Sequence, residues 1–71
     1  MSDSERKELI ALLGELSALC PDMRIGQLIA NLAVVARGAE PGAIWDMEDD
    51  ELLGAIQRQL AVFRGRQSQV A

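Results

Sequence analysis

The chain has no histidine, no tyrosine and a single cysteine, Cys20, among its 71 residues. Without histidine, a histidine general base, a catalytic triad built on one and every histidine-containing metal site are excluded. A lone cysteine cannot form an internal disulfide. Its position between Leu19 and Pro21 predicts a small buried hydrophobe, because a reactive thiolate needs an electropositive, partly exposed setting. We therefore expect no catalytic residues, no cofactor and no enzyme activity.

Positive charge and long apolar runs are also scarce. Seven Lys and Arg against eleven Asp and Glu give a net charge of −4, whereas binding to phosphates needs clustered Lys and Arg. No apolar run approaches the ~20 residues of a membrane span, and the first residues, MSDSERKE, lack a signal-peptide pattern. We expect a cytoplasmic protein that contacts no membrane and has little affinity for nucleic acid.

Helix-forming residues, by contrast, are abundant. Hydrophobic residues make up 49% and charged residues 25% of the chain, which is a globular balance. Apolar residues at helical spacing predict three helices near residues 4–20, 23–37 and 48–64, with no sheet. This pattern indicates an all-α protein, a small three-helix bundle, in which residues 1–65 form a single domain and residues 66–71 a flexible tail.

The helix ends and the core follow from individual residues. Ser2 has capping-box spacing, Pro21 ends the first helix, and Asp22 should cap the second. Gly38 and Gly65 are expected to end the second and third helices. The apolar faces predict a core of Leu9, Leu12, Leu13, Leu16, Leu28, Leu32, Leu53, Ile56, Leu60 and Phe63.

Residues 38–45, GAEPGAIW, are expected to form a loop. Its last two residues, Ile44 and Trp45, should fold back over the open end of the core. The following segment, DMEDDE (46–51), holds five acids in six residues. Acids in the first turn of a helix are favoured by ~0.3–1 kcal/mol each. Because the segment lacks the spacing of a calcium-binding loop, we expect no metal there.

The second predicted helix is apolar on nearly every side. Opposite its core face lie Gly26, Ala30 and Ala33, which are small rather than charged and permit close backbone approach. Two interpretations stay open: tight packing within the chain, and a seam for a homodimer or a partner helix. The seam is the one we favour, since a chain this short has little with which to cover such a helix.

A short polar strip, Arg24, Gln27 and Asn31, interrupts this helix. It could be a solvated edge, or a partner-binding edge in which Gln27 and Asn31 form directional hydrogen bonds. A third interpretation makes Arg24 structural. We predict that Arg24 forms a salt bridge with Glu48 or Asp49 of the acidic segment, which needs a counter-charge.

Two segments resemble a family of small uncharacterised bacterial and phage proteins. They are PDMRIGQLIANL (21–32) and IWDMEDDELL (44–53), and the family pattern is P-D-x-R-x-G-Q-L-x-x-N, then an aromatic pair and E-D-D-E-L. The likeness spans about residues 9–60, but Trp45-Asp46 stands where an aromatic pair is usual. The resemblance implies no activity. It implies these hallmark positions: Pro21, Asp22, Arg24, Gly26, Gln27, Asn31, Glu48 and Asp49.

Two functions remain open. The first is a non-catalytic protein-interaction module, with a partner of unknown identity, that can self-associate through the second helix as a homodimer. The alternative is a small phage-type or transcriptional regulator that contacts nucleic acid. A recognition helix would need Arg, Lys, Asn or Gln on an exposed face, whereas the third helix begins with acids that repel phosphate.

Overall fold

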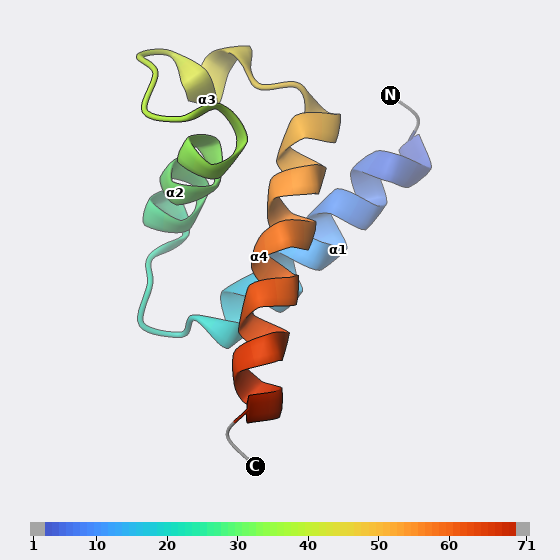
Figure 1. The fold of residues 1–71 in the computed structure, drawn as a ribbon. Coiled ribbons are helices and arrows are strands. Elements are labelled where there is room, and N and C mark those ends of the chain that lie inside the picture. The colour runs from blue at the N-terminus through green and yellow to red at the C-terminus, as the bar shows by residue number, and fades with distance from the viewer. Residues whose placement is uncertain (1–2, 70–71) are drawn as a thin grey trace.

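A computed structural model describes residues 3–69 of the chain, with the side chains of residues 3–65. It contains four helices (Figure 1), which are α1 (Asp3–Leu19), α2 (Ile25–Arg37), α3 (Ala43–Asp46) and α4 (Asp49–Gln69). Residues 3–69 contain no strand, so the all-α prediction is confirmed. Three helices lie close to the predicted ranges, whereas α3 lies in the segment expected to be a loop.

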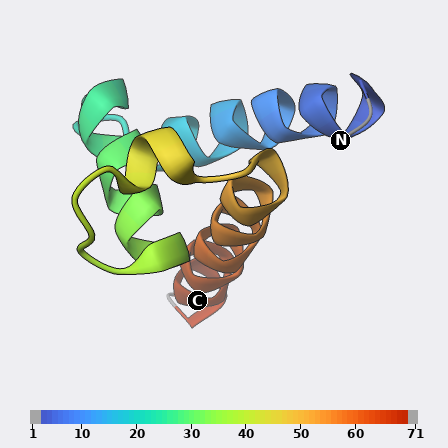
Figure 2. The ribbon, with the colours of Figure 1, turned by 90° about the horizontal axis from the view of Figure 1, so that it is seen from above.

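The central element is α4, which packs against both α1 and α2, while α3 packs on α2. Seen from above (Figure 2), the first half of α1 projects beyond the other helices. The molecule measures 39 × 28 × 18 Å. Nine hydrophobic residues of the described part of the chain are buried, whereas large ones such as Ile10 and Val62 are exposed. Much of each helix surface therefore stays in contact with solvent.

The core lies where α1 and α2 meet α4. The most deeply buried large side chains are Leu16, Leu32 and Ile56, one from each long helix. Every predicted core residue belongs to this cluster or packs against it, as helical spacing of apolar residues requires. Among the described residues, three buried alanines were not predicted as core: Ala55, which is fully buried within this cluster, and Ala33 and Ala43, which lie outside it.

The connection between α1 and α2 is longer than predicted. The Met23 N–H donates to the Cys20 carbonyl at 3.0 Å, which closes a turn with Pro21 at the position where proline is favoured. Because Asp22 is used in this turn, it is not the helix cap. The residue at the N-cap of α2 is Arg24, which makes no side-chain capping bond.

Glycine ends one predicted helix but not the other. Gly38 follows α2 with φ 78°, and its N–H donates to Val34 O at 2.7 Å. By contrast, α4 continues through Gly65 to Gln69, since a glycine inside a helix costs only about 1 kcal/mol relative to alanine. Residues 66–69 of the predicted tail are therefore helical. Ser2, the predicted first cap, and residues 70–71 lie outside the described residues.

Candidate functional site

Two arginines from other helices hold the acidic segment 46–51. Arg6 of α1 donates to Asp49 Oδ2, at 3.1 Å from Nη2 and 3.3 Å from Nε. Arg37, the last residue of α2, donates to Glu51 from Nε and Nη2, each at 2.9 Å. The start of α4 is thus tied both to α1 and to the end of α2.

Glu51 is the most strongly held of the acids. Besides the two bonds from Arg37, its Oε1 accepts the Glu48 backbone N–H at 3.1 Å, which is the carboxylate half of a capping box at the start of α4. The hydrogen bond from Arg37, followed by that from the Glu48 backbone, lowers the pKa of Glu51 below its ordinary value. The same bond raises the pKa of Arg37.

Arg24 does not supply the counter-charge to the acidic segment. Its side chain is exposed at the start of α2, and among the described residues no ion pair joins it to Glu48 or Asp49. The reason is topological. The chain leaves α2 at Arg37 to reach α4, and the 13 residues of α2 place Arg24 about 20 Å from that end.

The other two members of the polar strip are also exposed. Asn31 Nδ2 lies 3.6 Å from Met23 Sδ, so the amide contacts the α1–α2 connection rather than the acidic segment. Gln27 is exposed on the same helix. Nearby Cys20 is partly buried. The strip therefore lies apart from the charged groups with which Arg24 was predicted to pair.

The small-residue side of α2 is partly covered by the chain itself. Gly26 and Ala30 are exposed, but Ala33 is buried where α3 packs on α2. The residue that α3 buries is also an alanine, Ala43. Two small side chains let the backbones approach closely, so the predicted seam of Gly26, Ala30 and Ala33 is divided between an internal contact and an open face.

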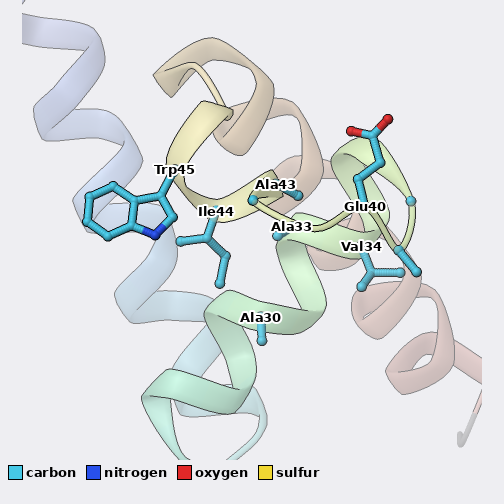
Figure 3. A pocket seen from close by; sticks show the side chains of 10 residues that line it. Ala30, Ala33, Val34, Glu40, Ala43, Ile44 and Trp45 are labelled. Carbon is cyan, nitrogen blue, oxygen red and sulfur yellow. The ribbon is translucent and has the colours of Figure 1, made fainter.

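Beside this contact lies an open apolar depression between α2 and α3, which we call the Trp45 groove (Figure 3). Its volume is about 350 Å³. Ile44 projects toward α2, while Trp45 extends outward from α3. The groove is lined by Ala30, Ala33, Val34, Gly38, Ala39, Glu40, Gly42, Ala43, Ile44 and Trp45.

Trp45 is the most exposed large hydrophobic side chain among the described residues. It is 91% exposed, and Ile44 is 52% exposed, so the prediction that these two residues cover the core is wrong. The cause is the single turn of α3, which starts at Gly42 in the left-handed conformation, with φ 82°. Successive residues of a helix are about 100° apart around its axis, so Trp45, two residues after Ala43, lies about 200° from it. When Ala43 faces α2, Trp45 therefore faces the opposite side.

The lining of the groove is almost entirely apolar. Glu40 is the one ionisable side chain in its lining, which contains no hydroxyl, thiol or amine. Among residues 3–69 there is no group of three side chains suited to hold a metal ion. Within the same range, no helix is both long and apolar enough to cross a membrane.

Comparison with known proteins does not test the family resemblance. No family model, curated protein or solved structure matches the chain. The likeness over residues 21–32 and 44–53 therefore stays a prediction.

Proposed function

We propose that this protein is a non-catalytic protein-interaction module, a bundle of three long helices with the one-turn α3, that docks another protein on the Trp45 groove. The observation that supports this most is the position of Trp45. Its indole is 91% exposed at the edge of a nearly all-apolar depression. Tryptophan is enriched among the few residues that dominate binding energy at interfaces.

Exposed hydrophobic residues are common when they are scattered over a surface. Here Val34, Ile44 and Trp45, from two different helices, line one depression. Ile10 and Val62 are also exposed but are not part of this lining. A contiguous apolar surface of this kind is typical of a binding site.

The size of the chain limits the interface. Its accessible surface is 4973 Å², so a standard contribution of about 800 Å² from one partner would cover roughly a sixth of it. A groove of about 350 Å³ can accept a few side chains of a partner helix. A transient complex fits these dimensions better than an obligate one.

A second copy of the chain is another candidate occupant, because Ala30 of the groove lining is exposed and α2 has no charged residue before Arg37. Nucleic acid is the weaker alternative. Glu40 lines the groove, and Asp46 and Glu51 of the acidic segment lie, like Glu40, near Arg37. Acids in these positions repel phosphate.

The test compares three forms of the intact chain in affinity capture from the host extract: wild type, Trp45→Ala and the control Ile10→Ala. Ile10 is 61% exposed on α1, away from the groove. We expect a protein retained by wild type and Ile10→Ala but lost with Trp45→Ala, and its binding must be reproduced with purified components. Equal retention by all three forms would refute the assignment of the groove. Light scattering at high micromolar concentration measures self-association separately.

A further inference from the structure

One end of the Trp45 groove carries negative charge that the chain leaves without an ion pair. Glu40 belongs to the lining and Asp46 ends α3, and both are exposed. Both lie near enough to Arg37 for their charges to act on it. Arg37, however, is already bound to Glu51, and among the described residues neither Glu40 nor Asp46 has an ion pair.

The rest of the groove is uncharged. Along α2 there is no ionisable residue from Ile25 to Ala36, and Val34, Ile44 and Trp45 form the exposed apolar walls. The surface thus combines an apolar strip with Glu40 in its lining. Asp46 lies beside it, since its Oδ2 is 3.5 Å from where a Cβ on the lining residue Gly42 would stand. A matching partner has an apolar stripe and cations beside it.

This charge pattern disfavours a second copy as the occupant. In a two-fold interface the same patch meets itself. The groove lining contains no Lys or Arg, so a second copy of this patch supplies no counter-charge to Glu40 or Asp46. Each chain also carries a net charge of −4, so two copies repel each other at long range. Cationic side chains at the same positions are attracted instead.

We propose that the occupant of the Trp45 groove is an amphipathic α-helix of another protein, with an apolar stripe flanked by Lys or Arg. This inference rests on the function proposed above and specifies its partner. Apolar side chains at i, i+3 and i+4 contact Val34, Ile44 and Trp45, while small Ala30 lets the helix approach. The flanking cations lie against Glu40 and Asp46. Residues 3–69 contain no sheet edge to which an extended peptide could add.

Trp45 is the only tryptophan in the chain, so its fluorescence reports directly on the groove. The probes are three designed helical peptides without tryptophan, which share one leucine stripe and have Lys, Gln or Glu at the flanking positions. We expect the Lys peptide to shift Trp45 emission to shorter wavelength in a saturable manner. The Gln peptide should bind about three- to tenfold more weakly, and the Glu peptide should give no saturable shift.

A variant pair locates the charge effect on the protein. Glu40→Gln/Asp46→Asn should lower the affinity for the Lys peptide by about three- to tenfold without changing the affinity for the Gln peptide. The matched control Glu8→Gln/Asp22→Asn alters the net charge equally, at exposed sites outside the groove lining. This control should bind the Lys peptide with an affinity within about twofold of that of the unaltered protein. The affinity of the unaltered protein for the Lys peptide should fall as the salt concentration rises.

Each contrary outcome has its own meaning. Equal binding of the Lys and Gln peptides at Trp45, or equal weakening by both double variants, would overturn the basic partner and leave the docking function standing. If no peptide shifts Trp45 emission, the amphipathic helix is overturned, while affinity capture still decides the function. If Trp45 emission shifts as the protein concentration rises without any peptide, and the protein then has the mass of a dimer, the groove would be assigned to a second copy.

Discussion

Arg37, the last residue of α2, holds Glu51, in the first turn of α4, through two hydrogen bonds of 2.9 Å. The segment that carries α3 and Trp45 lies between these two residues, so the ion pair closes it at its base. A loop held at both ends loses less conformational entropy when a partner binds. The Arg37–Glu51 pair therefore supports the groove without forming part of its lining.

The pair makes stability depend on pH. Since the folded pKa of Glu51 lies below its ordinary value of 4.5, its contribution is fully present well above pH 4.5 and is lost as the pH falls through the folded pKa. Glu51→Gln removes this contribution, so wild type and variant should differ most near neutral pH and converge in acid. Urea unfolding at a series of pH values measures this difference. A constant difference at every pH would contradict the pairing, and Arg37→Met should reduce the pH dependence in the same way.

Two glycines should respond oppositely to the same substitution. Gly38 has φ 78° and ψ −174°, a region essentially restricted to glycine, so Gly38→Ala should destabilise the fold by about 1–3 kcal/mol. Gly14 lies within α1 with open space around the position of an added Cβ. Gly14→Ala should stabilise by about 0.5–1 kcal/mol. Chemical denaturation measures the change in unfolding free energy of each variant. If the two changes had the same sign, α2 would have to end at a residue other than the one before Gly38.

The core prediction is tested at Leu16, whose side chain is completely buried. Leu16→Ala should cost about 2–5 kcal/mol of unfolding free energy, since a buried leucine leaves a cavity. Ile10→Ala, at a position 61% exposed on the same helix, should change stability by less than about 0.5 kcal/mol. A loss below about 1 kcal/mol at Leu16 would mean that α1 buries a different face.

The sequence predicted the core well and the groove poorly, for one physical reason. The period of apolar residues along a long helix reports directly on burial, which is why Leu16 and Ile56 were predicted to be buried. In a single-turn helix there is no period to read. Size alone then suggests that Trp45 is buried, whereas the left-handed Gly42 starts a turn that buries Ala43 instead. The Pro41-Gly42 dipeptide was the available signal of such a turn.

The arginine that meets the acidic segment could also have been found. A short connection places the start of α4 near the end of α2, which favours Arg37 over Arg24 as the partner. The pairing of the second arginine, Arg6, with Asp49 depends on how α1 crosses α4 (Figure 1). No local sequence pattern predicts that crossing. Helix boundaries are local properties of a sequence, whereas ion pairs between helices depend on the whole arrangement.

A double-mutant cycle distinguishes the observed pair from the predicted one. Arg6→Met combined with Asp49→Asn should show a coupling of about 0.2–1 kcal/mol, because the side chains are 68% and 38% exposed. Arg24→Met combined with Asp49→Asn should show none, since no ion pair joins these residues. The reverse result would restore Arg24 as the residue that meets the acidic segment.

The docking function is tested most directly by the effect of Trp45→Ala on the Kd of the captured partner, measured by calorimetric titration with purified proteins. Because Trp45 is 91% exposed, its truncation should leave the free energy of unfolding within about 0.5 kcal/mol of wild type. An interface centred on this indole should then bind about 30-fold or more weakly, the loss typical of a dominant interface residue. An unchanged Kd in a variant of unchanged stability would contradict the assignment of the groove as the docking surface.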